Sequence, residues 1–527
     1  MENKIKKIIN SRHTIIVLTL FLICLVAITG TYAWFTWNSE ENTELTMTIG
    51  DIADVIFSTG NDITTSLTPV FNYTSGEKTN FTIKNNDNTG GMLLYTITLN
   101  ITSIPEVLRN EQVKYALEKN DKLIREGDLS NAVDGSSIDI YTNNLVPGST
   151  DFDFYIYIDS NEENDRNMIE ANLKGNIMVE GSEYTPSTIA TFISDLYTTS
   201  DKTVVTNNNI EYNNANAVVL MNDRLGGTTE DYNAGNIRYY GPYVENYIYF
   251  NCNDYDNPSA STCEKWRIIG NFDGMTKILR NEIIGLFAYD NKTAGLGSST
   301  SIYGSDDWND ARLMMLLNDG YENGATDADG ENIYEYEGSL YWNAGGTSGA
   351  NGTCYAGQGN ATTSCDFTPS SSTPGLKNDK TRNLIAETTW NINQNNYLTN
   401  AFSNEFYVLE NTGGSTWNGA ITIPYVSDYS YAVDFNKCTV TLSNYKTCVS
   451  SNWMNNIFIL NTPNYTAYYF LNPNSNSESG TIVLAHFGTF SSGGVRAGNG
   501  IVPTLHLNTQ TMISGGDGSY ENPYIIY

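Results

Sequence analysis

Polar and apolar residues alternate with a period of two in several runs of the first third of the chain. The clearest runs are LTMTI at 45–49, NFTIK at 80–84, YTITLNI at 95–101 and DFDFYIYID at 151–159. This period places one face of a strand in a core and the other in solvent, and turn-forming Asn, Gly and Pro separate the runs. The pattern predicts a two-sheet β-sandwich over residues 38–181. The run at 107–119 fits either a short helix or a further strand.

A helical period follows the sandwich. Apolar side chains take the i, i+3, i+4, i+7, i+8 spacing of one helix face, at Ile189, Phe192, Ile193, Leu196 and Tyr197. Thr185 is the expected N-cap, with Pro186 in the first turn. The surrounding polar, Asn-rich sequence predicts that residues 182–236 form a linker containing this helix. Its apolar face must pack on something, and we expect that to be the next domain.

Residues 237–527 mix strand and helix patterns. The run WRIIGNFDGMTKIL at 266–279 predicts a hairpin that turns at Asp273-Gly274. The run WNDARLMMLLN at 308–318 predicts a helix that begins near Asp307 or Asn309. The pattern as a whole predicts an α+β domain, so the chain is mainly β with an α+β part.

The net charge narrows the class of partner. The 527 residues include 59 Asp or Glu and 28 Lys or Arg, which gives a formal net charge of −31. A nucleic-acid binder needs a basic face to neutralise phosphates, so this balance argues against nucleic acid. Because 40% of the residues are hydrophobic and only 17% are charged, the chain is not a disordered acidic tail.

The first 37 residues predict export. Residues 1–13 carry four basic side chains and one acidic one, and residues 14–37 carry no charge, which is long enough for a transmembrane helix with its basic end in the cytoplasm. Thr31-Tyr32-Ala33 also fits a signal peptidase site with cleavage after Ala33. A membrane anchor and a cleaved signal peptide both remain open. Either one places the rest of the chain, with −31 − 3 = −34 charges, outside the cell, as the extracellular part of a membrane protein or as a secreted or cell-wall protein.

Six cysteines beyond the export segment form three close pairs. They are Cys252 with Cys263, Cys354 with Cys365, and Cys438 with Cys448. The even count and the predicted export favour three local disulfides, each contributing about 2 to 3 kcal/mol by restricting the unfolded chain. A metal site is the alternative, but the sequence contains no CxxC or HxxxH pattern.

The N-terminal part resembles a known family. The runs TYAWFTWNSEENTELTMTIGDI, SLTPVFNYTSGEKTNFTIKNN and LVPGSTDFDFYIYI are similar to the TasA and camelysin family of exported Gram-positive matrix proteins. The resemblance covers roughly residues 23–181. It implies a jelly-roll-like sandwich that can self-assemble into fibres by donating an N-terminal strand, here residues 34–50 after removal of Ala33. The alternative is a spacer that holds the second domain away from the membrane.

The C-terminal part carries WRIIG at 266–270, a W-x-x-A-x-L pattern at 308–313, and a final strand and tail that read IVPTLHLN and GGDGSYENPY. These motifs resemble those of an uncharacterised family of Firmicutes surface domains. The resemblance implies an α+β arrangement with long loops, related to the C-type lectin-like fold. Members of that family often have Trp where Phe458 stands and Arg where Val502 stands, so any pocket at those positions is altered here.

Calcium is the one cofactor that the sequence raises. Trp308-Asn309-Asp310 spells a calcium-ligand motif of C-type lectins, but the proline-containing loop of those lectins is missing and the residues fit a helix cap. Asp327 and Asp329 resemble part of an EF-hand loop, although Tyr336 stands where the bidentate Glu belongs. A solvated turn is the competing interpretation.

Ligand-binding and catalytic candidates are also few. Trp342, Trp390 and Trp417 are candidate platforms for sugar rings, with burial in the core as the alternative. The chain has no G-x-S-x-G motif, and nothing in it selects a carboxylate pair for glycoside hydrolysis. His486 and His506 lie in strand patterns and fit core or surface positions.

We therefore expect a non-enzymatic surface or secreted protein. It would consist of an N-terminal anchor or signal, a β-sandwich stalk and a disulfide-stapled lectin-like domain that binds an extracellular glycan or protein. A biofilm-matrix fibre subunit released by cleavage is one alternative, and a secreted hydrolase is another.

Overall fold

The computed structural model describes a defined part of the chain. The described residues are 35–38, 44–49, 53–58, 63–85, 92–160, 166–169, 171–184, 188–207, 210–225, 235–287, 289–290, 305–318, 341, 375–393, 401–460, 467–473, 480–485, 488–495 and 497–527. Their contacts divide the chain into two compact units, Met1–Thr185 and Pro186–Tyr527.

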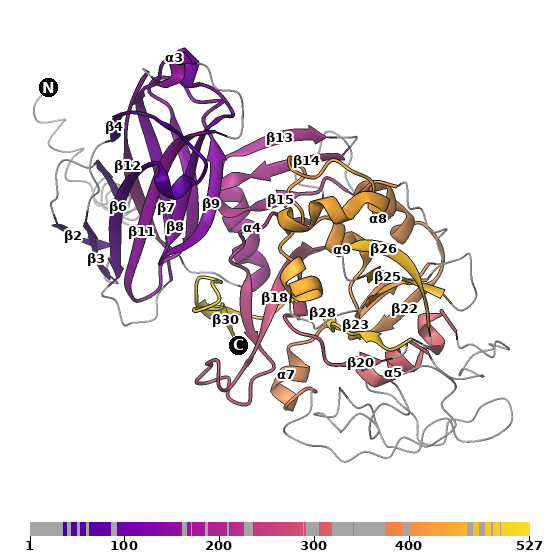
Figure 1. The fold of residues 1–527 in the computed structure, drawn as a ribbon. Helices are drawn as coiled ribbons and strands as arrows, with labels where there is room; N and C mark the ends of the chain where they lie inside the picture. Colours follow the sequence, from indigo (N-terminus) through magenta and orange to yellow (C-terminus); the bar gives the residue numbers. More distant parts are fainter. Residues whose placement is uncertain are drawn as a thin grey trace, which may run out of the picture. The chain divides into compact units, whose positions relative to one another are not determined.

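The first unit is built from two sheets (Figure 1). One has the strand order β1-β12-β7-β10, with β4 also paired to β12: β1 (Phe35–Asn38), β4 (Ile63–Ser66), β7 (Met92–Ser103), β10 (Ser137–Asn144) and β12 (Asn172–Tyr184). The other has the order β2-β3-β6-β11-β8-β9, with β5 paired to β11: β2 (Glu44–Ile49), β3 (Ala53–Ser58), β5 (Pro69–Val70), β6 (Glu77–Asn85), β8 (Val113–Lys119), β9 (Lys122–Asp128) and β11 (Gly148–Asp159). Three short helices lie between consecutive strands of this unit: η1 (Tyr73–Ser75), η2 (Glu106–Leu108) and α3 (Arg166–Ile169).

One core joins the two sheets, as the alternating pattern predicts. Phe81 of β6, Ile97 of β7 and Phe154 of β11 are almost fully buried in the same hydrophobic cluster. All four alternating runs of the sequence lie in strands, so those predictions are confirmed. The ambiguous run at 107–119 forms mainly strand β8, because it pairs with both β9 and β11.

Only the last residues of the predicted export segment are described. Residues 14–34, including Ala33, lie outside the described part, but Phe35–Asn38 is strand β1, which pairs with β12 through Phe35 opposite Gly181. Residues 35–37 of the predicted segment therefore lie in a strand. No helix among the described residues is long and apolar enough to span a membrane.

The second unit is also rich in strands. Its largest sheet has the order β13-β14-β15-β16-β18-β19-β28-β23, with β17 paired to β18: β13 (Lys202–Asn207), β14 (Ile210–Ala215), β15 (Leu220–Asn222), β16 (Ile237–Tyr239), β17 (Tyr247–Phe250), β18 (Glu264–Phe272), β19 (Met275–Arg280), β23 (Ile421–Thr422) and β28 (Thr504–His506). A second sheet has the order β20-β27-β24-β25-β26: β20 (Leu286–Phe287), β24 (Tyr468–Pro473), β25 (Gly480–Ala485), β26 (Thr489–Gly494) and β27 (Asn499–Gly500). Two ribbons complete the strands: β21 (Thr388–Asn391) with β22 (Thr416–Gly419), and β29 (Ile513–Gly515) with β30 (Ile525–Ile526).

Short helices surround these sheets. They are α4 (Ile189–Thr199), η3 (Asn216–Val218), η4 (Trp308–Asp310), α5 (Arg312–Leu317), α7 (Asp379–Asn383), α8 (Ser403–Asn411), α9 (Val426–Ser430), η5 (Leu442–Ser451) and the π-helical turn η6 (Asn456–Leu460). The predicted helix at 308–318 corresponds to η4 and α5. Asp307 caps it, since its carboxylate accepts the backbone N–H of Asn309 at 3.0 Å.

The segment predicted as a linker is part of the second unit. Strands β13 to β15 extend its largest sheet, and the backbone N–H of Ile189 at the start of α4 donates to Thr511 O at 3.0 Å. The expected apolar face of α4 is buried, but the N-cap is Thr188 and not Thr185: its hydroxyl accepts the N–H of Thr191 at 3.1 Å. Backbone pairing requires no apolar side chain, which is why the Asn-rich strands resembled a linker in sequence.

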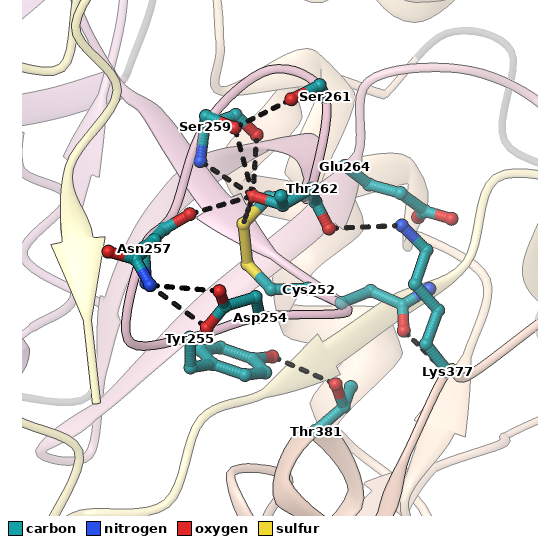
Figure 2. Close-up of a disulfide and its surroundings, with 12 residues drawn as sticks. Cys252, Asp254, Tyr255, Asn257, Ser259, Ser261, Thr262, Glu264, Lys377 and Thr381 are labelled. Atoms are coloured by element: carbon teal, nitrogen blue, oxygen red, sulfur yellow. Dashed lines mark hydrogen bonds between the residues drawn. A yellow bond between two sulfur atoms is a disulfide. The ribbon is translucent and has the colours of Figure 1, made fainter.

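Two of the three predicted disulfides lie in described regions, and both are present. Cys252 is bonded to Cys263 and Cys438 to Cys448; Cys354 and Cys365 lie outside the described residues. Figure 2 shows how the first bridge closes a loop that also holds α7, because Tyr255 in the loop shares a hydrogen bond of 2.9 Å with Thr381. The staple thus orders a loop and the helix packed against it.

A candidate ligand pocket beside a buried charge network

The second unit contains a pocket of about 810 Å³. Its wall is drawn from α4, from the start of β16, from the β18–β19 turn and from α8, elements that are distant in sequence. The lining residues are Ser194, Leu225, Gly235, Asn236, Ile237, Asn271, Asp273, Gly274, Tyr407, Val408, Asn411 and Thr412. This volume lies within the range of about 300 to 1,000 Å³ that is typical of small-molecule sites.

The α4 wall is fixed by side chains of the central sheet. Asn271 of β18 donates its amide to Ser194 Oγ at 2.8 Å and to Ala190 O at 3.2 Å. The opposite face of α4 is buried through Phe192 and Ile193. The polar face of α4 is therefore held toward the pocket by the packing of its apolar face.

The β18–β19 turn presents a carboxylate. Asp273 and Gly274 have φ angles of 49° and 78°, the left-handed conformation that both central residues of a type I′ hairpin need. The sequence predicted this turn correctly. The exposed Asp273 is the only charged side chain among the pocket-lining residues that the structure describes.

Helix α8 presents two different faces. Ser403, Phe406 and Glu410 are buried, while Tyr407, Val408 and Asn411 line the pocket. Val408 is 49% exposed, which leaves an aliphatic surface available to a ligand.

A buried carboxylate organises the wall behind Tyr407. Asp223, 1% exposed, accepts Arg238 Nε at 2.6 Å and both the backbone N–H and side-chain amide of Asn236, at 2.8 and 2.9 Å. The same Asn236 amide donates to the hydroxyl of Tyr407 at 3.1 Å. Burial raises the pKa of Tyr407 above its ordinary value, so the hydroxyl stays protonated at neutral pH.

A second buried carboxylate joins two cations. Asp428 accepts Lys277 Nζ at 2.6 Å, and its other oxygen lies 3.8 Å from Arg238 Nη1. Burial lowers the pKa of Lys277 below its ordinary value, and Asp428 opposes that shift. For Arg238 burial also disfavours the charged form, but Asp223 and Asp428 outweigh it and raise the pKa.

Glu410 completes this network from α8. Its Oε1 accepts the backbone N–H of Ser427 at 3.0 Å, and it is 3% exposed. Burial raises the pKa of Glu410 to about 7, and the nearby Asp428 adds to the increase. With Glu410 protonated, two cations face two carboxylates in the interior, so the network is neutral.

Sequence reasoning missed this network, since Arg238 and Lys277 are single charges in short strand patterns and such charges usually face solvent. The only sequence signal is that the apolar neighbours of Lys277 do not alternate, as in a strand buried on both faces.

The tryptophans proposed as sugar platforms lie elsewhere. Trp390 and Trp417 are opposite each other on β21 and β22, but Trp390 is 2% exposed and packs against His506 with ring centres 4.9 Å apart. A ring this buried offers no face to a ligand, so that prediction is wrong for Trp390. Trp417 is partly exposed and contacts Trp308; neither Trp390 nor Trp417 lines the pocket. Trp342 lies outside the described residues.

Of the other residues singled out in the sequence, some are buried and some lie outside the described residues. His506 is a core residue, and burial lowers its pKa to about 3, with Lys277 adding to the decrease. Asp327, Asp329 and His486 lie outside the described residues, and the described part contains no cluster of three metal-ligating side chains. Phe458 and Val502, where the resembled family often has Trp and Arg, are both buried.

Comparisons with known proteins add little. No protein-family model and no curated protein matches this chain. Among solved structures, a GH26-CBM35 β-(1,4)-mannanase of Podospora anserina is 11% identical over 32% of this chain and 35% of its own, with a TM-score of 0.17. A family 35 carbohydrate-binding module from an environmental isolate is 10% identical over 24% of this chain and 94% of its own, with a TM-score of 0.14. A PA14 sugar-binding domain from an RTX adhesin is 10% identical over 28% and 86%, with a TM-score of 0.11. TM-scores this low do not establish a shared fold.

Proposed function

We propose that the chain is an exported, non-enzymatic binding protein whose second unit takes a glycan in the pocket between α4, α8 and the β18–β19 turn. The observation that carries the proposal is the chemistry of the lining. The lining combines the aliphatic side chains of Leu225, Ile237 and Val408 with amide and hydroxyl side chains, namely Ser194, Asn236, Asn271, Tyr407, Asn411 and Thr412. A sugar ring combines hydroxyls with apolar C–H surface, and this lining complements both.

Binding fits the lining better than hydrolysis does. Glycoside hydrolysis needs two carboxyl groups on either side of the scissile bond, and Asp273 is the one acid among the described lining residues. Asp223 and Asp428 are engaged with buried cations and do not line the pocket. In this proposal the first unit is the stalk between the export segment and the binding unit.

A glycan array probed with the exported chain, followed by calorimetry on any hit, tests the proposal. Val408→Arg places a long cationic side chain at the pocket wall, and we expect it to abolish binding. The matched control is Val204→Arg, because Val204 is an exposed valine of the same unit, 54% exposed on β13, that does not line the pocket. An empty array, or equal loss of binding in both variants, would overturn the proposal. Release of reducing sugar from the bound glycan would replace it with a hydrolase.

A second function, a matrix fibre subunit, is favoured by one observation. Strand β1 begins two residues after Ala33 and pairs along β12 of the sandwich. Cleavage after Ala33 would therefore leave this strand at the new N-terminus, where another copy could exchange it, as the TasA-like resemblance implies. N-terminal sequencing of the native protein tests this, and an intact residue 1 or 2 at the N-terminus contradicts it.

A further inference from the structure

The orientation of Asn236 is unambiguous, although amide oxygens and nitrogens are hard to tell apart. A carboxylate only accepts hydrogen bonds, so the side-chain atom that faces Asp223 at 2.9 Å must be the amide nitrogen. The same nitrogen donates to the hydroxyl of Tyr407 at 3.1 Å. Both of its hydrogens are therefore assigned.

This assignment determines whether the Tyr407 hydroxyl donates or accepts a hydrogen bond in the pocket. Its hydroxyl oxygen already accepts a hydrogen from Asn236, which leaves its own O–H to act as a donor. The Arg238 guanidinium, centred 5.3 Å from the ring of Tyr407, occupies the buried side of the residue. Tyr407 thus offers the pocket a hydrogen-bond donor, and a ligand must meet it with an acceptor such as a carbonyl oxygen.

Two other parts of the pocket lining favour different chemical groups on the ligand. The Asp273 carboxylate can only accept, so it needs an N–H or O–H from the ligand. Leu225, Ile237 and the exposed Val408 provide aliphatic surface, which favours an apolar group such as a methyl. One pocket therefore combines a donor, a charged acceptor and an apolar surface.

From this combination we infer that the pocket takes an N-acetylated amino sugar. The acetamido group carries a carbonyl for Tyr407, an N–H for Asp273 and a methyl for the aliphatic surface, whereas a simple hexose lacks the carbonyl and the methyl. A peptide also carries these groups, but the exposed side chains of Asn411 and Thr412, an amide and a hydroxyl, favour a ligand with several hydroxyls. The inference rests on the proposed glycan binding and specifies its ligand class.

Calorimetry of the exported chain with two matched disaccharides tests the inference. N,N′-diacetylchitobiose and cellobiose share the same β-1,4-linked backbone and differ in acetamido against hydroxyl. We expect the acetylated probe to bind at least tenfold more tightly, the effect of about one additional satisfied hydrogen bond. Equal binding of both probes overturns the acetamido inference and leaves glycan binding intact. Binding of neither probe overturns the acetamido inference as well, and an empty glycan array then overturns the proposed function. Binding of the blocked peptide acetyl-Ala-Ala-Ala-amide in place of either sugar assigns the pocket to a peptide instead.

Two variants separate the contacts from general effects on folding. Asp273→Asn keeps a residue that tolerates the left-handed turn but removes the charge, and we expect about tenfold weaker binding of diacetylchitobiose. Asp121→Asn is the control, because Asp121 lies in the Asn120-Asp121 turn of the first unit with a φ of 61°. Tyr407→Phe should bring the affinities of the two disaccharides closer together. An unchanged ratio in Tyr407→Phe would contradict the assigned donor.

Discussion

The ionisation of Glu410 is expected to make the stability of the second unit depend on pH. Glu410 is a buried residue of α8, and burial raises its pKa to about 7. The folded state holds this proton more tightly than the unfolded state, whose carboxyl has an ordinary pKa of 4.5. Stability from this group is therefore fully present below pH 4.5 and is lost as the pH rises through 7.

The size of the effect follows from these two values. A separation of about 2.5 pKa units, at about 1.4 kcal/mol per unit, corresponds to about 3.4 kcal/mol at full ionisation. Between pH 5 and pH 8 the expected loss of stability is about 2.5 kcal/mol, because the carboxyl of the unfolded state is already partly ionised at pH 5. Glu410→Gln removes the titration but keeps an acceptor for the N–H of Ser427, which lies 3.0 Å from Glu410 Oε1.

Denaturant unfolding at pH 5 and pH 8 measures this difference. Tryptophan fluorescence reports on the second unit, where Trp266, Trp308, Trp390 and Trp453 are buried. Relative to the wild type, the variant should gain about 2.5 kcal/mol of stability on going from pH 5 to pH 8. Glu387→Gln, at an exposed glutamate, is the control and should show no such change. A stability difference between wild type and Glu410→Gln that is the same at both pH values would refute the reasoning.

Three further predictions concern other parts of the second unit. Burial lowers the pKa of His506 to about 3. The neutral imidazole therefore stabilises the fold above pH 6.5, the pKa of the unfolded state, and this stability is lost as the pH falls toward 3. His506→Gln should reduce that loss by up to about 5 kcal/mol, measured by denaturant unfolding at pH 7 and pH 3. Ile193→Ala empties a fully buried position of α4 and should cost about 2 to 5 kcal/mol in the same assay at pH 7, and a cost below 1 kcal/mol would contradict the docking of this helix on the sheet. A Cβ at Gly270 of β18 would lie 2.1 Å from Ile237 O, so Gly270→Ala should lower the melting temperature by several degrees, while Gly494→Ala on β26, where a Cβ meets nothing within 4 Å, should leave it nearly unchanged.

Local patterns account for much of the fold. The alternating run at 151–159 forms most of β11, because a period of two in the side chains fits a strand. The turn at Asp273-Gly274 and the pairing of Cys252 with Cys263 are also local, since each is decided by residues close together in sequence. The Asn-rich strands around β14 were missed because their pairing depends on backbone hydrogen bonds, which side-chain polarity does not reveal.

The candidate site, in contrast, is a product of tertiary structure. The sequence pattern placed Asn236 in a linker and Asp273 in a turn, and it did not mark Tyr407. Only the tertiary packing brings the three residues to one pocket. The buried network has the same origin, because a charge can be tolerated inside only where a distant partner meets it, as Asp428 meets Lys277 across 151 positions of sequence. The sequence by itself determined that this protein has a sandwich and a disulfide-bonded second unit rich in strands, because those features depend on local periodicity and spacing. The tertiary structure decided which polar residues line a pocket and which are buried in pairs, because that depends on contacts between residues far apart in the chain.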